Sequence, residues 1–335
     1  MDRAHIVLAL ESSCDDTSAA IIIDGHVHAN VVDSQDVHKA YGGVVPELAS
    51  REHLSRIIPV VDRALKKAEI SKRELSAIAF TRGPGLLGSL IVGVNFSKSL
   101  SLALGIPMIS VNHMEAHVMA HFAEQPHPSF PFLCLTVSGG HTQIVKLTDY
   151  NEMQILGETK DDAAGEAFDK SGKILGLPYP AGPVIDKLAK TGKPIYSFST
   201  STMPDFDYSF SGLKTSILYF LKRELKKDPK FIENNLPDIC ASIQHTIVTY
   251  LLSIFEKAAK KEGITQLGIA GGVSANSLLR SSFTTMCAKN NWRSFIPKLQ
   301  YCTDNAGMIG ISGYYKLLKE DFVQQDVFPD ARLRF

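Results

Sequence analysis

The sequence has few cysteines, no excess of charge of either sign and no long uninterrupted apolar run. Its five cysteines, at positions 14, 134, 240, 287 and 302, include no C-x-x-C pair, which argues against a disulfide framework or a cysteine-based zinc site. Lys plus Arg number 35 and Asp plus Glu number 35, so there is no general basic coat for nucleic acid, and any such binding is local or shared with partners. We therefore expect a reducing compartment, the cytoplasm.

Signals for export and for membrane insertion are also missing. The first residues run directly into a strand-like stretch, without the charged, apolar and small-residue succession of a signal peptide. The most apolar region, residues 86–109, contains Asn95, Lys98 and several serines. This region is therefore predicted to be a buried helix followed by a strand rather than a membrane span.

The 335 residues, 44% of them hydrophobic, are enough for two ordinary cores. Residues 5–23 and 132–147 each contain an apolar run, a polar turn and a second apolar run, which predicts a β-hairpin in each half and suggests two related lobes. Between and after them helical and strand patterns alternate, which predicts an α/β fold with at least partly parallel sheets. The expected helices cover residues 89–104, 163–175 and 239–261, and the expected strands cover residues 75–80, 108–111 and 267–270.

A turn at residues 83–88, GPGLLG, has the form of the dinucleotide-binding G-x-G-x-x-G. That fingerprint needs an acidic residue at the end of the next strand to bind the ribose, and residues 108–112 offer none. We interpret the segment as a tight turn between a strand and a helix.

His113 and His117 stand four positions apart, so on a helix they share one face and can chelate one ion. The zinc-peptidase pattern H-E-x-x-H is not met, because Glu115 stands about 200° around the helix from the position that peptidase chemistry needs. The pair is either surface decoration or part of a metal site with a third ligand from elsewhere. Asp304 is a candidate for that ligand, although spacing alone does not select it.

Two glycine-rich turns are candidate ligand cradles. Ser138, Gly139 and Gly140 expose backbone amides to an approaching phosphate or carbonyl oxygen, or they form only a hairpin turn. Residues 271–276, GGVSAN, follow a strand and precede a helix, so a base or ribose can lie on the glycines with Asn276 bonding it. The alternative is a plain turn with Ser274 as helix N-cap.

Clusters of charged residues are less specific. Asp162, Glu166, Asp169 and Lys173 fall on neighbouring turns of one expected helix, and such faces are commonly just solvated. The basic stretches at residues 51–73 and 222–230 either contact an RNA backbone or are solvated helix faces.

Taken together and in order, these motifs resemble the TsaD family of tRNA adenosine threonylcarbamoyltransferases, formerly described as sialoglycoprotein endopeptidases. The resemblance covers nearly the whole chain, with Ser12 standing where threonine is more usual. The motifs that carry it lie at residues 11–17, 41–51, 81–85, 113–117, 137–142, 182–183, 209–215 and 271–276.

The resemblance implies a two-lobed actin/Hsp70/sugar-kinase-like (ASKHA) fold with duplicated RNase H-like lobes and a nucleotide cleft between them. The lobes would be residues 1–128, completed by residues 306–335, and residues 129–305. It further implies one divalent metal ion, Fe²⁺ or alternatively Zn²⁺, on His113, His117 and Asp304, with Asp15 near the reacting end of the substrate. Residues implied to bind the substrate are Thr136, Val137, Ser138, Gly139, Gly140, Asp169, Gly182, Asp186 and Asn276.

The implied activity is an acyl transfer. The threonylcarbamoyl group moves from threonylcarbamoyl-AMP to the exocyclic amine of the tRNA adenosine immediately 3′ of the anticodon, and AMP is released. The implied partners are tRNA, a TsaB-like paralogue and a TsaE-like ATPase, with no membrane or DNA.

Two other classes remain as alternatives at this point. One is an ATP-dependent small-molecule kinase of the same fold, and the other is a non-catalytic nucleotide-binding scaffold subunit. Kinases of this fold use acidic residues with magnesium and need no histidine pair, whereas a degenerate scaffold is expected to lose His113, His117 or Asp304. All three residues are present.

Overall fold

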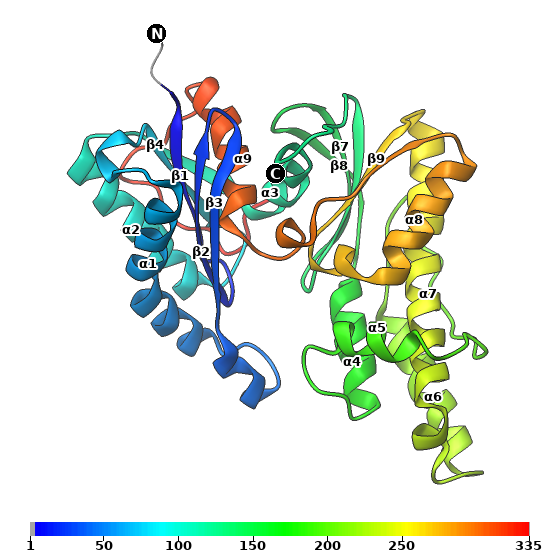
Figure 1. Ribbon diagram of the computed structural model, residues 1–335. Coiled ribbons are helices and arrows are strands. Elements are labelled where there is room, and N and C mark those ends of the chain that lie inside the picture. Colours follow the sequence, from blue (N-terminus) through cyan, green and yellow to red (C-terminus); the bar gives the residue numbers. More distant parts are fainter. Residues whose placement is uncertain (1–3, 335) are drawn as a thin grey trace. The chain divides into compact units, whose positions relative to one another are not determined.

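The computed structural model describes residues 4–334 and shows an α/β chain that divides into two compact units (Figure 1). Unit 1 contains the chain up to Pro128, a short segment Thr148–Met153, and the chain from Pro297 onward. Unit 2 contains Ser129–Leu147 and Gln154–Ile296. The lobes expected from the sequence place residues 297–305 in the second lobe, whereas in the structure these residues, including Asp304, pack with unit 1.

Unit 1 is built on a five-stranded sheet of order β3-β2-β1-β4-β5. Strands β1 and β2 form the predicted antiparallel hairpin, β3 continues it, and β4 and β5 run parallel to β1. Every residue of β1 is buried, as expected of a strand covered on both faces. The strands are β1 (Ile6–Glu11), β2 (Asp16–Ile23), β3 (His26–Ser34), β4 (Ala77–Gly83) and β5 (Met108–Asn112).

Helices cover both faces of this sheet. Helices α1 (Pro46–Ala68) and α2 (Leu87–Leu104) pack against each other, and Val60 and Val94 join one core with Leu8 and Phe80 of the strands. Helix α9 (Ala306–Leu318) packs on the strand residues that alternate with these. Ala79, the neighbour of Phe80, is one of them, since a Cβ on Gly313 of α9 would come 2.4 Å from the Cβ of Ala79. Because side chains alternate across a strand, α9 lies on the opposite face.

Unit 2 repeats the same sheet. Its order, read from the β8 edge, is β8-β7-β6-β9-β10, with β6 and β7 antiparallel and β9 and β10 parallel to β6. The prediction of one hairpin in each half is therefore confirmed, and the two sheets match strand for strand. The strands are β6 (Phe132–Val137), β7 (Thr142–Asp149), β8 (Glu152–Glu158), β9 (Gln266–Ala270) and β10 (Arg293–Phe295).

The helices of unit 2 enclose a second, larger core. They are α4 (Ala164–Ile174), α5 (Ala181–Ala189), α6 (Ser211–Leu225), α7 (Phe231–Glu262) and α8 (Ser277–Lys289). The sequence predicted α7 only from residue 239, but the helix begins at Phe231 and continues through Pro237. Pro237 has no amide to donate to the Glu233 carbonyl, and the helix continues through it because the turns from Ile239 onward are buried in the core of unit 2.

Helices α2 and α7 are long and apolar enough to cross a membrane by length and composition alone. In α7, 61% of the most apolar window is buried inside the protein, and α2 packs on α1 and β4. As predicted, α2 ends at Gly105, whose φ of 65° closes the helix, and the strand β5 follows. Both helices therefore serve the cores of their own units.

Candidate functional site

Helix α3 (His113–Met119) begins directly after β5 and carries the histidine pair. The Asn112 side chain caps the helix, since its Oδ1 accepts hydrogen bonds from the amides of Met114 (2.8 Å) and Glu115 (3.3 Å). As predicted, His113 and His117 share one helix face, with ring centroids 4.7 Å apart and planes at 84°. Both rings are buried, so the pair is not surface decoration.

Asp304 joins this pair from the segment that precedes α9. Its Oδ1 lies 3.3 Å from Nε2 of His113 and 3.3 Å from Nε2 of His117. One ligand atom from each of the three residues lies within 4.8 Å of the others. The three residues predicted as metal ligands therefore meet inside unit 1.

Glu11, the last residue of β1, supports this cluster. Its Oε2 lies 2.9 Å from Nδ1 of His113 and also accepts a hydrogen bond of 2.7 Å from the Thr81 hydroxyl. A carboxylate can only accept, so Nδ1 of His113 carries the proton and Nε2 faces Asp304. Sequence reasoning missed this role; the available signal was an acidic residue that ends an otherwise apolar strand.

The charges of the cluster depend on one another. Burial lowers the pKa of His113, but the carboxylates of Asp304 and Glu11 outweigh burial and hold this pKa well above its usual range. Burial alone raises the pKa of Asp304, yet His113 and His117 hold it far below its usual value. For His117, burial dominates and lowers the pKa. His117 is therefore a neutral imidazole, the form that binds metals.

The donor set fits a divalent metal ion. Among the described residues, Nδ1 of the buried His117 has no hydrogen-bond partner, and its Nε2 has only the 3.3 Å contact with Oδ1 of Asp304. A buried polar atom whose bonding is incomplete is costly unless a ligand satisfies it. Two imidazoles and one carboxylate also leave coordination positions open, as catalytic metal sites require. These three residues form the candidate metal site of the chain.

The supporting role of Glu11 gives a testable prediction. Glu11→Gln removes the negative charge that orients and polarises His113, so we expect metal affinity to fall roughly 10- to 100-fold, the usual effect of losing such an outer partner. Titration against a chelator of known affinity measures this. Glu115→Gln is the matched control, because the buried Glu115 contacts Lys316 at 3.5 Å instead. Equal affinities in the two variants would contradict the role given to Glu11.

The residues predicted to bind substrate gather in unit 2, in two bonded groups. The first joins Asp169 of α4 to the start of α5, since its Oδ1 accepts from the amide of Ala181 at 2.7 Å, next to Gly182. The second joins Asp186 of α5 to the start of α8, where the amide and hydroxyl of Ser277 donate to its Oδ1 at 3.2 and 2.6 Å. Burial raises the pKa of Asp169.

Asn276 occupies the N-cap of α8, where its Oδ1 accepts from the amide of Leu279 at 3.0 Å. The alternative that made Ser274 the cap is wrong, because Ser274 lies inside the short 3₁₀ turn Gly272–Ala275 that precedes the helix. The capping bond fixes the side chain of Asn276.

The glycine turn (residues 138–141) lies close to the first turn of α4 and to Gly271. The amide of Gly165 donates to the Ser138 carbonyl at 3.2 Å, and a Cβ on Gly165 would come 2.6 Å from the same oxygen. Gly271 has a φ of 83°, and a Cβ there would come 2.4 Å from the Val137 carbonyl. These contacts place the turn at the carboxyl ends of β6 and β9, the edge where open α/β sheets bind ligands.

The individual positions differ in what they can offer. Thr136 and Val137 are fully buried within β6, so their side chains cannot reach a ligand at the surface. Gly139 and Gly140 are open, because a Cβ on either would meet no described atom within 4 Å. Asp15 belongs to unit 1, in the acidic turn (residues 12–17), whereas the other predicted substrate-binding residues belong to unit 2.

The G-x-G-x-x-G segment is a turn between a strand and a helix, as interpreted from the sequence. It links β4 to α2, and a Cβ on Gly85 would come 2.5 Å from the Ser13 carbonyl of the acidic turn. The amide of Leu86 donates to that carbonyl at 2.8 Å. The glycine therefore permits close packing within unit 1.

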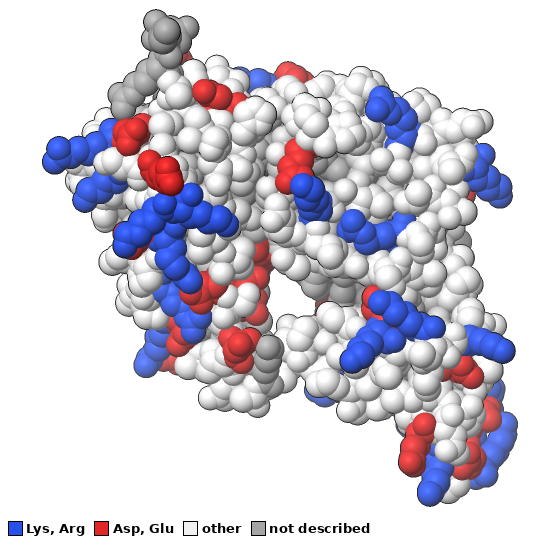
Figure 2. Space-filling view, viewed as in Figure 1, with Lys and Arg blue, Asp and Glu red and all other residues white. Residues whose placement is uncertain are grey.

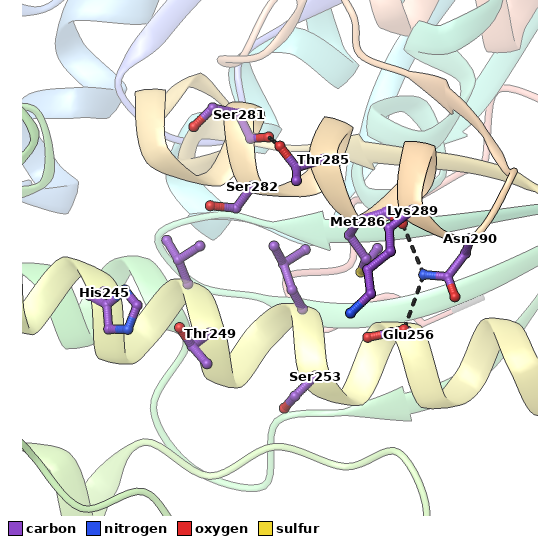
Figure 3. Close-up of a pocket in the computed structure, with 12 residues that line it drawn as sticks. His245, Thr249, Ser253, Glu256, Ser281, Ser282, Thr285, Met286, Lys289 and Asn290 are labelled. Carbon is purple, nitrogen blue, oxygen red and sulfur yellow. Dashed lines mark hydrogen bonds between the residues drawn. The ribbon is translucent and has the colours of Figure 1, made fainter.

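Other surface features lie away from these residues. An open pocket between α7 and α8 is lined by His245, Glu256, Thr285 and Lys289 among others, and contains none of the predicted site residues (Figure 3). Basic and acidic side chains are interspersed on the face shown in Figure 2. In the basic stretch of α1, Arg56 pairs with Asp33 and Glu52, which favours the interpretation as a solvated helix face.

Solved structures define the class of the protein by its fold. The chain matches HypF from T. kodakarensis with a TM-score of 0.61 at 12% identity, over 98% of this chain and 50% of that one. It matches component A of the (R)-2-hydroxyglutaryl-CoA dehydratase from Acidaminococcus fermentans with a TM-score of 0.54 at 13% identity, over 95% and 100%. These neighbours are ASKHA-type proteins, and the expected fold class is confirmed.

Sequence relatives define the family. The family model TsaD, tRNA N6-adenosine threonylcarbamoyltransferase, matches residues 26–311. Proteins of that name from Christiangramia forsetii and Porphyromonas gingivalis are 57% and 54% identical to this chain, over 100% and 99% of it and 99% of each relative. The chain belongs to the TsaD family of tRNA N6-adenosine threonylcarbamoyltransferases.

Proposed function

We propose that this protein transfers a threonylcarbamoyl group from threonylcarbamoyl-AMP to the exocyclic N6 amine of the tRNA adenosine immediately 3′ of the anticodon. The N6–carbamoyl bond forms, the bond from the carbamoyl carbon to the phosphate oxygen breaks, and AMP leaves. The observation that carries this proposal is the buried His113–His117–Asp304 cluster, in a chain of this family. We further propose that the reaction takes place in the cytoplasm.

In this proposal the adenylate binds to unit 2. The open amides of Gly139 and Gly140 receive phosphate or carbonyl oxygen, and fixed backbone dipoles stabilise charge without reorganising. Asp169, Asp186 and Asn276 are held in place by their bonds to helix starts. Such pre-oriented groups are suited to bind the adenosine hydroxyls and base.

His113, His117 and Asp304 would hold one divalent metal ion, which we propose to be Fe²⁺, with Zn²⁺ as the alternative. A set of two histidines and one carboxylate with open positions is typical of non-haem Fe²⁺ sites and also suits catalytic Zn²⁺. When bound, the ion supplies a Lewis acid that neutralises charge on the reacting anhydride. Glu11 fixes the ring of His113 with its Nε2 toward Asp304, the side on which the ion would bind.

Asp15 is proposed to orient the attacking amine or to accept its proton. Asp15→Asn keeps the shape of the side chain and removes the base, so we expect kcat to fall about 100-fold with little change in KM for tRNA. Asp16→Asn is the control: burial raises the pKa of Asp16 to about 7, so a neutral side chain is accommodated there. Steady-state transfer rates of the two variants test whether Asp15 has this role, and an unimpaired Asp15→Asn enzyme would refute it.

The proposed partners, besides tRNA, are a TsaB-like paralogue and a TsaE-like ATPase. Helices α1 and α2 support a paralogue contact, because each exposes two apolar side chains one helical turn apart. Leu54 and Ile58 of α1 are 69% and 66% exposed, and Leu87 and Ile91 of α2 are 52% and 41% exposed. Paired apolar side chains on two packed helices are the kind of surface that another helix pair covers.

Mass spectrometry of tRNA nucleosides tests the proposed function directly. Unmodified tRNA is incubated with this protein, its paralogue and ATPase partners, an adenylate-forming enzyme, threonine, bicarbonate and ATP. We expect threonylcarbamoyladenosine to appear, and to stay absent when this protein is omitted. Failure to form the nucleoside, while an established family member succeeds with the same tRNA, would overturn the proposal.

A further inference from the structure

Another buried histidine of unit 1, His53, lies outside the metal cluster and outside every predicted site. His53 stands on α1 and is fully buried. Its Nδ1 lies 2.8 Å from the Thr17 hydroxyl and its Nε2 lies 2.9 Å from the Cys14 carbonyl. A carbonyl only accepts, so Nε2 carries the proton and Nδ1 accepts the Thr17 hydroxyl proton. Both bonds end in the acidic turn, one before Asp15 and one after it.

Helix α2 holds the same turn from its first residues. The hydroxyl of Ser89 donates to the Cys14 carbonyl at 3.3 Å, and the hydroxyl of Ser12 donates to the Ser89 carbonyl at 3.1 Å. These bonds reach only the part of the turn that precedes Asp15. The part that follows Asp15 belongs to β2 and is held by its ladder with β3, where Thr17 pairs with Asp33, and by the Gln35 amide, which donates to the Asp15 carbonyl at 3.1 Å. The bond from Thr17 to His53 is the side-chain link from this part to α1.

The acidic turn also touches the metal cluster. The hydroxyl of Ser13 lies 3.2 Å from Nδ1 of His113, and the amide of Ser13 donates to Glu11. A shift of the turn would therefore displace Asp15 and disturb the surroundings of His113 together.

The other inward-facing residues of α1, such as Ile57 and Val60, are aliphatic. They join or flank the core, where only volume and shape matter. An imidazole with both nitrogens bonded to one polar turn can orient that turn, which an aliphatic side chain cannot do, because hydrogen bonds fix direction as well as distance.

We propose that His53 is a positioning residue for the transfer reaction. By hydrogen bonding to the acidic turn on both sides of Asp15, it fixes the position of the Asp15 carboxylate relative to the metal cluster. This inference rests on the proposed function of the chain. A misplacement of about 1 Å in a reacting group can cost 100-fold in rate, so a residue that never touches the substrate can control kcat.

Three substitutions separate positioning from packing. A glutamine amide nitrogen stands as many bonds from the main chain as Nε2, so His53→Gln retains the donor to Cys14. In His53→Asn the amide oxygen stands as many bonds from the main chain as Nδ1, so this variant retains only the acceptor for the Thr17 hydroxyl. His53→Ala retains neither. Val60→Ala is the control, because it makes a cavity in the same helix without touching the turn.

In the complete complex at saturating substrates, we expect His53→Ala to lower kcat 10- to 100-fold, with KM for tRNA changed less than twofold. His53→Asn should recover kcat to within about threefold of wild type, because Ser89 still donates to the Cys14 carbonyl in that variant, and His53→Gln, which loses the Thr17 contact, should recover less. Val60→Ala should melt at a lower temperature and keep its kcat. If His53→Ala retains kcat, or if Gln and Asn variants perform alike, His53 is only a core residue and the inference is wrong.

Hydrogen–deuterium exchange of the peptide covering residues 12–17 gives a readout that does not depend on activity. We expect His53→Ala, but not Val60→Ala, to accelerate exchange of these amides at a temperature where both proteins are folded. Unchanged exchange would overturn the positioning role even in an active enzyme. A wild-type protein that fails to modify tRNA would instead count against the proposed function, and the exchange measurement would still decide the inference.

Discussion

Replacing His117 by alanine is expected to remove the metal ion and, with it, nearly all transfer. Structural zinc sites with four protein ligands bind with free energies of about 10–16 kcal/mol, or roughly 3 kcal/mol per ligand, so the loss of one of the three ligands here should lower the metal affinity about 100-fold or more. A Lewis acid contributes several kcal/mol to a transition state, so kcat should fall about 1,000-fold in the metal-depleted variant. Metal content after dialysis and single-turnover transfer are the two measurements.

The control for this substitution is His245→Ala. His245 is an exposed histidine of α7 in the pocket of Figure 3, and it belongs to unit 2, whereas the metal cluster belongs to unit 1. This variant should keep both metal and activity, which would show that the loss of an unrelated histidine does not abolish either. Full transfer by metal-free His117→Ala protein would exclude the metal from the reaction.

Gly271→Ala is expected to destabilise unit 2 far more than the same change one residue later. Gly271 has a φ of 83°, and an added Cβ would come 2.4 Å from the Val137 carbonyl. The strained backbone and the clash together should cost about 2–4 kcal/mol. For a unit of this size that corresponds to a fall in melting temperature of roughly 5–10 °C. Calorimetry on the purified protein measures it.

Gly272→Ala is the matched control, since a Cβ at Gly272 would meet no described atom within 4 Å. It should melt close to wild type. Because the Val137 carbonyl leads into the glycine turn, Gly271→Ala should also raise KM for the adenylate, roughly tenfold if one oriented contact of about 1.4 kcal/mol is lost. Equal melting temperatures for the two alanine variants would contradict this prediction, because they would show that the backbone at Gly271 accommodates a Cβ without loss of stability.

Local signals in the sequence were sufficient for much of the fold. The two hairpins follow from apolar runs on each side of a polar turn, and Gly105 marks the end of α2 because a left-handed residue closes a helix. The extent of α7 could not be predicted in this way. Its proline lies near the start of a helix whose later turns are fixed by burial in the core, which is a tertiary effect.

The metal cluster shows where reasoning from the residues stops. The spacing of His113 and His117 predicts a shared helix face, but Asp304 comes from a segment almost two hundred positions later. It was one candidate for the third ligand, and only the resemblance to a family selected it. Glu11 was missed because its role depends on a ring brought to it by a different strand. His53 gave no signal at all, since a histidine in an amphipathic helix has the same pattern whether or not it bonds a turn.

The matching strand order of the two sheets has an evolutionary consequence. In a symmetric dimer of one half-length ancestor, both copies would present the same hairpin turn. Two acidic turns would repel a phosphate, and two glycine turns would provide no carboxylates. Once both copies are joined in one gene, each turn is free to change alone. In this chain one turn bears Asp15 and contacts His113 through Ser13, and its counterpart bears Gly139 and Gly140, a division of labour that a symmetric ancestor could not encode.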